Sequence, residues 1–95
     1  MKNDIALLFK ALSDENRLTI LELLIQGETC GCTLIDKLTI TQPTMSYHLR
    51  QLTDVGIINS YKEGIWKKHH VDIAKIDELI EFLTDLKNAK GNCEV

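Results

Sequence analysis

The chain has 95 residues and a mass of 10.8 kDa, which is room for one domain. Hydrophobic residues make up 44% and charged residues 26%, a balance that argues against a disordered chain and against a membrane protein. No apolar run approaches the roughly 18 residues of a membrane helix, and the N-terminus does not resemble a signal peptide. We therefore expect a cytoplasmic protein with no membrane partner.

The net charge of −3 argues against nucleic-acid binding when it is taken alone. The charge is unevenly distributed, however, because residues 37–72 carry five basic and three acidic side chains while both flanking segments are acidic. This middle segment is the part of the chain that suits a polyanion.

Two helices are predicted at the N-terminus. The first runs from Asn3, as N-cap, to Leu12, and Ser13 is the predicted N-cap of the second. The second helix continues through Ile25 and stops near Gly27, and its apolar residues surround most of its circumference. We expect that helix at the centre of the core.

A helix-turn-helix is predicted next. After an extended segment from Glu28 to Cys32, Thr33 caps a short third helix, and Thr41 caps a fourth with Pro43 in its first turn. The fourth helix ends before Gly56, and its inward stripe consists of Met45, Leu49, Leu52 and Val55. The tight turn between these helices is typical of DNA-binding proteins.

The pattern changes to a β-hairpin between residues 57 and 71, with Glu63-Gly64 at its turn and Trp66 expected opposite Tyr61. A last helix is predicted from Ile73 to about Lys87. The fold class is thus mainly α with a β-hairpin, a winged helix-turn-helix. Residues 1–90 form the DNA-binding and dimerisation domain, and residues 91–95 a flexible C-terminal tail.

The outward face of the fourth helix carries short polar side chains and one guanidinium, which suit the base edges of a major groove. An ordinary polar surface is the alternative, and His48, beside the core stripe, fits a structural hydrogen-bonding role. The hairpin lysines suit phosphates, although edge lysines also prevent aggregation. The candidate contacts to double-stranded operator DNA are Gln42, Thr44, Ser46, Tyr47, Arg50, Lys62, Lys67 and Lys68.

The first and last helices have more apolar surface than a small core can cover. We expect them to form the two-fold interface of a homodimer, which would place two recognition helices at successive half-sites. The alternative is that both helices close a single core.

The cysteines are the remaining chemical signal. Three cysteines in a reducing compartment do not make a disulfide framework, so metal binding or thiol chemistry is the better interpretation. Cys30 and Cys32, which are separated by one residue, can bind one soft ion, and Cys93 can complete a three-coordinate centre. The alternatives are two small buried side chains and an incidental tail residue.

Three segments resemble signatures of the ArsR/SmtB family of metal-sensing repressors. The segment from Glu28 to Leu34, which contains Cys30-Gly31-Cys32, resembles the metal box of that family. Leu12 to Leu18 and Gln42 to Leu49 resemble its other two signatures, and Lys62 to Trp66 resembles its wing.

The resemblance implies a homodimeric winged-helix repressor that leaves its operator when an ion binds. Within the family, the arsenic-responsive branch uses the Cys-x-Cys pair with a further cysteine. For this chain the resemblance implies As(III) or Sb(III) as effector, the metal ligands Cys30, Cys32 and Cys93, and no organic cofactor. His69 and His70 lie on a hairpin strand, where a strand or surface role is expected.

Two other readings remain open. The same repressor fold can sense cadmium, lead or zinc, or its thiols can sense oxidants or reactive sulfur. A small thiol enzyme is the least favoured reading, because the sequence has no Cys-x-x-Cys beside a βαβ pattern. We therefore expect a regulator and not an enzyme.

Overall fold

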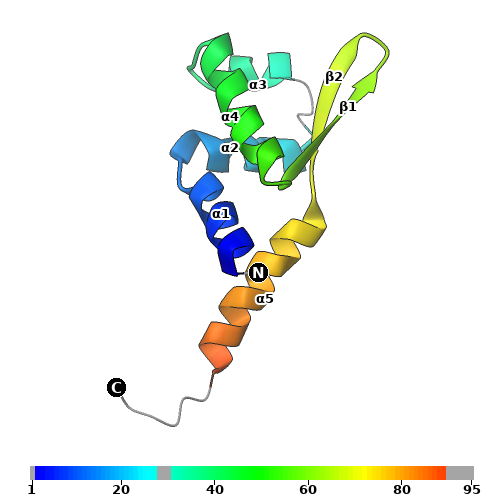
Figure 1. The fold of residues 1–95 in the computed structure, drawn as a ribbon. Coiled ribbons are helices and arrows are strands. Elements are labelled where there is room, and N and C mark those ends of the chain that lie inside the picture. Colours follow the sequence, from blue (N-terminus) through cyan, green and yellow to red (C-terminus); the bar gives the residue numbers. More distant parts are fainter. Residues whose placement is uncertain (1, 28–30, 90–95) are drawn as a thin grey trace.

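The computed structural model describes residues 2–27 and 31–89. The elements follow one another as α1 (Lys2–Leu12), α2 (Glu15–Ile25), α3 (Gly31–Lys37), α4 (Gln42–Asp54), β1 (Ile58–Glu63), β2 (Trp66–Val71) and α5 (Ile73–Asn88). A head built from α2, α3, α4 and the β1–β2 hairpin stands on a stem formed by α1 and α5 (Figure 1). This is the predicted mainly helical winged helix-turn-helix.

One apolar core joins the head to the stem. Ile20 of α2, Leu34 of α3, Leu52 of α4 and Ile58 of β1 are all completely buried. Leu8 of α1 and Leu79 of α5 extend the same cluster into the stem. Because every helix and β1 contribute to this cluster, it fixes the position of α4 and the hairpin. Within the described ranges, no helix is both long and apolar enough to cross a bilayer.

The helix-turn-helix is confirmed in detail around α4. Thr41 has extended backbone, and its Oγ1 accepts a hydrogen bond from the Thr44 backbone N–H at 3.3 Å, which makes it the N-cap of α4. Pro43 occupies the first turn, where a missing N–H costs no hydrogen bond. Four residues, 38–41, connect α3 to α4, where a tight turn of about three was predicted.

Two predicted caps near the N-terminus are wrong. Helix α1 begins at Lys2, so Asn3 lies within the helix. The cap of α2 is Asp14, whose carboxylate accepts from the Arg17 N–H at 3.1 Å. Ser13 instead donates its hydroxyl proton to the Lys10 carbonyl at 2.6 Å and so closes the end of α1. Ser13 and Asp14 are both favourable N-cap residues, and in the structure Asp14 occupies the N-cap position.

The segment before α3 also differs from expectation. Gly31 and Cys32 were predicted to be extended and Thr33 to be a cap, but all three backbones belong to α3. Glycine and threonine are poor helix formers, which is why the pattern placed the helix start too late. Complete burial of Leu34 outweighs that preference. The rest of the predicted extended segment, residues 28–30, lies outside the described residues.

The hairpin is present with a shifted turn. Glu63 and Trp66 form its last pair, so the connection is Gly64-Ile65, one residue later than predicted. Gly64 has φ +64°, the left-handed conformation that this turn requires. The expected pairing of Tyr61 with Trp66 is wrong, because Tyr61 lies opposite Lys68. That difference follows directly from the later turn, since one step in the turn changes every cross-strand partner.

The hairpin leads into α5 through Asp72. Its carboxylate accepts from the Ala74 N–H at 3.0 Å and caps the helix, while its own N–H donates to the Ile57 carbonyl at 2.8 Å. Helix α5 then runs away from the head beside α1 (Figure 1). The predicted tail, residues 91–95, lies outside the described residues.

Candidate functional site

The predicted recognition face of α4 points to solvent. Its candidate base-reading side chains are all exposed, namely Gln42, Thr44, Ser46, Tyr47 and Arg50. The opposite side of the helix is anchored in the core by Met45, His48 and Leu52, while Leu49 and Val55 are half-buried. The Thr44 hydroxyl also accepts a hydrogen bond from the Thr41 hydroxyl at 3.0 Å, which ties it to the helix cap.

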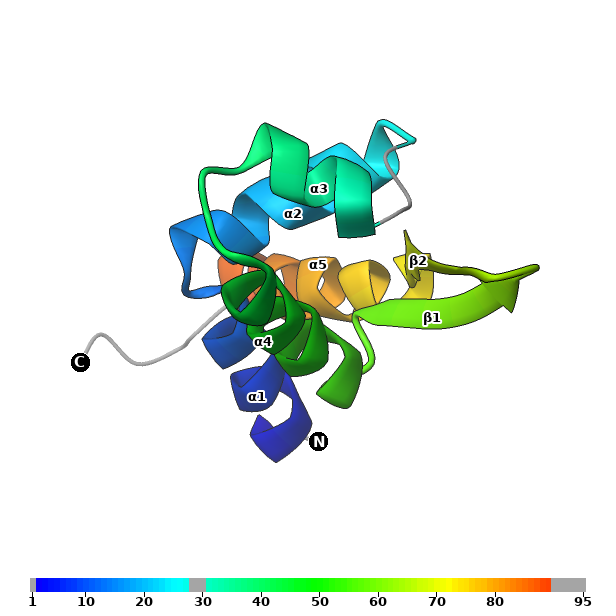
Figure 2. The same ribbon diagram turned by 90° about the horizontal axis from the view of Figure 1, so that it is seen from above.

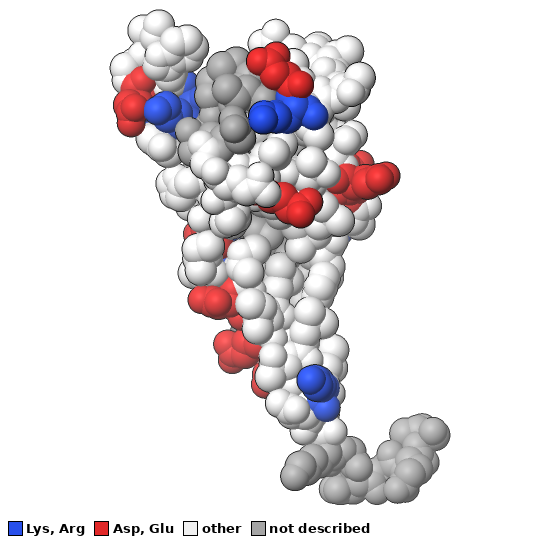
Figure 3. All heavy atoms as spheres, turned by 180° about the vertical axis from the view of Figure 1, so that it is seen from behind, with Lys and Arg blue, Asp and Glu red and all other residues white. Residues whose placement is uncertain are grey.

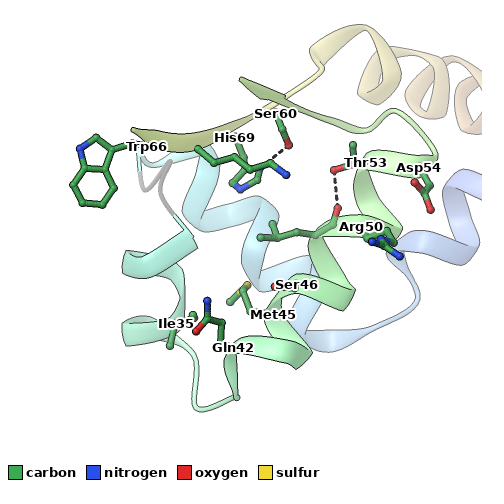
Figure 4. A pocket seen from close by; sticks show the side chains of 12 residues that line it. Ile35, Gln42, Met45, Ser46, Arg50, Thr53, Asp54, Ser60, Trp66 and His69 are labelled. Atoms are coloured by element: carbon green, nitrogen blue, oxygen red, sulfur yellow. Dashed lines mark hydrogen bonds between the residues drawn. The ribbon is translucent and has the colours of Figure 1, made fainter. Parts of the chain in front are cut away.

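A groove of about 620 Å³ separates α4 from the hairpin. Gln42, Ser46 and Arg50 line it from α4, and Lys67 lines it from β2. Figure 4 shows His69 and Ser60 on the strands facing α4, with Trp66 at the outer end of the hairpin. Four of the predicted DNA contacts therefore border one concave surface, with donors that suit base edges and phosphates.

The strand register separates the three wing lysines. Lys62 and Lys67 lie directly opposite each other, on the same face of the hairpin as the pair Ser60 and His69. Neither lysine has an ion-pair partner among the described residues. Lys68 lies on the other face, where its Nζ is 2.9 Å from a carboxylate oxygen of Glu63. The helix-facing side of the hairpin is thus the more strongly cationic side.

His69 forms the floor of the groove on the hairpin side. Its side chain is buried, and its Nδ1 lies 2.7 Å from the Ser60 hydroxyl oxygen. Burial, followed by the positive charge of Lys67, lowers the pKa of His69 below its ordinary value. The Nδ1 of a neutral His69 can accept a hydrogen bond from the Ser60 hydroxyl, so this pair joins the two strands as a structural contact. His70 is exposed, with its ring against Tyr61.

His48 links the recognition helix to α2. It is 6% exposed, and its Nε2 lies 3.9 Å from Oδ1 of Asp14, the α2 cap. Its Nδ1 has no hydrogen-bond partner among the described residues, so the expected structural hydrogen bond is not made there. The position nevertheless matches a packing role, because His48 fills the space between α4 and the start of α2.

Only part of the thiol region falls within the described residues. Cys30 and Cys93 lie outside them, and Cys32 is described only as the second backbone position of α3. Within the described part of the chain, no three His, Cys, Asp or Glu side chains gather closely enough to hold a metal ion. The donor set itself fits a soft ion, since thiolates prefer such ions. Helix α3 packs against both α4 and β2.

A second surface lies on the stem. The α5 side chains Ile80, Leu83 and Leu86 are each more than half exposed, and Leu7 of α1 is 45% exposed. Phe9 of α1 and Phe82 of α5 hold the two helices together, with ring centroids 6.0 Å apart. Seen from behind, the stem shows a broad uncharged surface with acidic side chains along one side (Figure 3).

The sequence interpretation missed several residues of the groove. Trp66 was expected to pack against Tyr61 but borders the groove, and Thr53, Ser60 and His69 had no role assigned there. The alternation of the hairpin could have placed Ser60 beside Lys62 on the helix-facing side. No local pattern could have placed Thr53, because its exposure to the groove depends on how the hairpin docks on α4.

Comparison with known proteins identifies relatives over nearly the whole chain. Residues 14–60 match the model described as bacterial regulatory protein, arsR family. An HTH-type transcriptional regulator of Methanocaldococcus jannaschii is 40% identical over 80 residues, 83% of this chain and 90% of that protein. An arsenical resistance operon repressor of Staphylococcus aureus is 32% identical over 90 residues, 95% and 86% of the two chains. A cadmium resistance transcriptional regulatory protein homolog from Staphylococcus aureus is 37% identical over 79 residues, 82% and 65% of the two chains.

Solved structures give the same fold. An ArsR-like transcriptional regulator from Rhodococcus superposes with a TM-score of 0.83 at 26% identity, covering 90% of this chain and 81% of that one. The homodimeric winged helix-turn-helix DNA-binding domain of a possible ArsR-family regulator from Mycobacterium bovis has a TM-score of 0.71 at 25% identity, covering 98% and 89%.

These matches extend over both the head and the stem, and they agree with the arrangement of α3, α4 and the hairpin described above. The family consists of transcriptional regulators and not of enzymes, which confirms the expectation from the sequence. The chain is a winged helix-turn-helix transcriptional regulator that belongs to the ArsR family.

Proposed function

We propose that this regulator is a metalloid-responsive repressor. Its metal-free homodimer binds operator DNA. As(III) or Sb(III) binds to Cys30 and Cys32, with Cys93 as third ligand, and the ion-bound protein dissociates from the DNA. The observation that carries the proposal is the position of α3. This short helix contains Cys32 and packs against both α4 and β2, the two elements that border the groove.

DNA binding rests on the composition of the groove. The α4 side chains Gln42, Ser46 and Arg50 offer donors and acceptors to base edges, and Lys67 offers a charge to a phosphate. Thr44 and Tyr47 are exposed on the same helix, and Lys62 adds a second charge on the helix-facing side of the hairpin. Lys68 contributes less in this proposal, because Glu63 already compensates its charge.

Dimerisation rests on the exposed apolar surface of the stem. Leu7, Ile80, Leu83 and Leu86 leave an apolar surface that a second copy of the chain can cover. A two-fold interface there would place two copies of α4 on one side of the dimer, as successive half-sites of an operator require. The Mycobacterium bovis domain of the same fold is described as homodimeric, which supports dimerisation itself.

Ion capture is proposed to act through α3. Thiolates bind thiophilic ions tightly, and three sulfur ligands suit As(III) and Sb(III). Drawing Cys30 and Cys32 onto one ion changes the start of α3, and the packing of α3 on α4 and β2 passes that change to both borders of the groove. The protein is proposed to act in the cytoplasm, where thiols remain reduced.

A soft divalent metal is the second candidate effector, and one specific observation favours it. A relative named for cadmium resistance is 37% identical to this chain. The same sulfur ligands bind Cd²⁺, so the thiol pair alone does not separate the two ions.

Fluorescence anisotropy of a labelled operator duplex tests the proposal. The duplex is selected from a random pool by the wild-type protein under reducing conditions. Arsenite is expected to release wild-type protein, and Cys30→Ser and Cys32→Ser are expected to bind the duplex but to ignore arsenite. Thr84→Cys is the matched control, because it adds an exposed thiol on α5, away from the proposed DNA face and the proposed ion site. Binding of the duplex that persists at saturating arsenite would refute the effector assignment.

Parallel titrations separate the other candidates. Release by Cd²⁺ but not by arsenite would assign the divalent metal. Release by peroxide or persulfide that dithiothreitol reverses would assign a thiol-oxidation sensor. The sulfur coordination number of bound arsenic, from X-ray absorption, reports on Cys93: three sulfur ligands are expected in wild type and two in Cys93→Ser.

A further inference from the structure

The tip of the hairpin is apolar and uncovered. Ile65 is 90% exposed, more than any other large hydrophobic side chain among the described residues, and the adjacent Trp66 is 55% exposed. A Cβ atom placed on Gly64 would meet no atom within 4 Å, so the space around the turn is open. Figure 2 shows the hairpin projecting away from α3 and α4, with this turn at its far end.

The charge behind the tip indicates what kind of partner it meets. Lys62 and Lys67 lie opposite each other just behind the turn, on the helix-facing side, and neither has an ion-pair partner among the described residues. Lys67 also borders the groove with Arg50. The apolar tip is therefore continuous with the cationic surface proposed for DNA. A polyanion that also has a narrow groove with apolar walls fits both the lysines and the apolar tip.

We propose that Ile65 enters the minor groove next to the major groove occupied by α4, and that it makes affinity depend on the base pairs beneath it. This inference rests on the proposed DNA binding. A six-residue strand spans roughly 20 Å at about 3.3 Å per residue. Adjacent major and minor grooves lie roughly 17 Å apart, half of a helical turn. The minor groove is only about 6 Å wide, so it admits the side chain of a turn but not the ribbon behind it.

The chemistry of isoleucine predicts which base pairs are favoured. Its side chain can cover deoxyribose and the groove floor, but it cannot hydrogen-bond. Over an A·T pair the floor carries only acceptors, whereas a G·C pair adds the guanine amino group, which projects into the groove. An isoleucine placed there leaves that donor without a partner. The tip should therefore discriminate against G·C pairs that α4 never contacts.

Inosine provides the decisive test, because an inosine·C pair lacks the minor-groove amino group but keeps the major-groove pattern of G·C. In the selected duplex, the A·T pairs outside each α4 contact are replaced one at a time by G·C and by inosine·C. Wild-type affinity is expected to fall roughly 3- to 10-fold with G·C, and to recover with inosine·C.

Three variants isolate the side chain. Ile65→Ser should bind the A·T duplex more weakly by a similar factor and should no longer distinguish the three base pairs. Ile65→Val, which keeps an apolar tip, should retain the discrimination. Ile25→Ser changes another exposed isoleucine, 63% exposed at the end of α2, and should behave like wild type. No non-glycine residue among the described ones has positive φ, so serine at position 65 introduces no backbone strain.

Equal responses of wild type and Ile65→Ser to G·C and inosine·C would overturn the proposal while leaving DNA binding intact. Hydroxyl-radical footprints that show no protection of the minor groove beside the α4 site would also overturn it, and would point to another partner for the tip. Failure of the wild-type protein to bind any duplex would instead refute the proposed function, together with this inference.

Discussion

Lys62 of β1 lies directly opposite Lys67 of β2, so two positive charges face each other across the hairpin. Like charges in directly opposed positions destabilise a strand pair. The arrangement becomes favourable when an anion lies against both ammonium groups. This pair therefore carries a cost in the free protein, which contact with a phosphate backbone in the proposed DNA complex would relieve.

Replacing either lysine of this pair should weaken DNA binding without weakening the fold. Lys62→Ala and Lys67→Ala should each reduce the slope of log affinity against log salt by about 1, because one phosphate contact is lost. Their free energies of unfolding should equal or exceed that of wild type. Lys68→Ala is the control on the same hairpin, and its salt slope should change less because Glu63 pairs with Lys68. Equal slopes for all three variants would contradict the separation of the two faces.

Asp14, and not Ser13, should control the stability of α2. Asp14→Ala should lower the free energy of unfolding by about 1 kcal/mol, the usual contribution of an N-cap. Asp14→Asn should retain most of that contribution, because asparagine is also a good N-cap. Ser13→Ala should change it by less than about 0.5 kcal/mol, because its exposed hydroxyl only closes the end of α1. Urea denaturation at one fixed protein concentration measures all three variants. A larger loss for Ser13→Ala than for Asp14→Ala would refute the cap assignment.

His69 should make the protein less stable in mild acid. Its pKa is lowered in the folded state, so the unfolded chain binds a proton first as the pH falls below about 6.5. The contribution of neutral His69 is thus complete above that pH and is lost as the pH decreases towards the folded-state pKa. Free energies of unfolding at about pH 7.5 and about pH 5.5 should differ less in His69→Asn than in wild type. His70→Asn, on the exposed face, should keep the wild-type difference, and an identical effect of both variants would contradict the assignment.

Introducing a charge on the apolar surface of the stem should separate the subunits. Leu83→Glu should weaken self-association by roughly 30-fold or more, because a central apolar side chain at an interface is replaced by a charge that must be desolvated. Sedimentation equilibrium measures the change. Thr84→Glu adds the same side chain at the next position, which lies towards the acidic side of α5, and should leave association unchanged. A wild-type protein that is monomeric at high micromolar concentration would refute this interface.

The sequence was informative where local chemistry and core packing agree. Thr41 and Pro43 predicted the start of α4 correctly, because a side-chain cap and a proline in the first turn are determined locally. The switch from helical to alternating periodicity similarly predicted the hairpin, and the single glycine of its turn adopts the positive φ that was expected.

The sequence was less informative where two local solutions compete or where packing decides. Ser13 and Asp14 are both good caps, and the turn at Gly64 can be drawn one residue earlier or later, which changed the partner of Trp66. The groove itself depends on the docking of the hairpin against α4, a contact between segments that no periodicity describes. The exposed residues of α4 were identified because their helical positions oppose a recognisable apolar stripe.

The reciprocal effect of DNA and arsenite on each other's affinity tests most directly whether the thiol pair controls DNA binding. Duplex affinity is measured with and without saturating arsenite, and arsenite affinity with and without saturating duplex. Thermodynamic linkage requires the duplex affinity and the arsenite affinity to fall by the same factor, expected to be roughly 10- to 100-fold. Both decreases should vanish when Cys30 and Cys32 are replaced by serine. A duplex affinity that is unchanged when arsenic occupies the thiols would contradict the proposed switch.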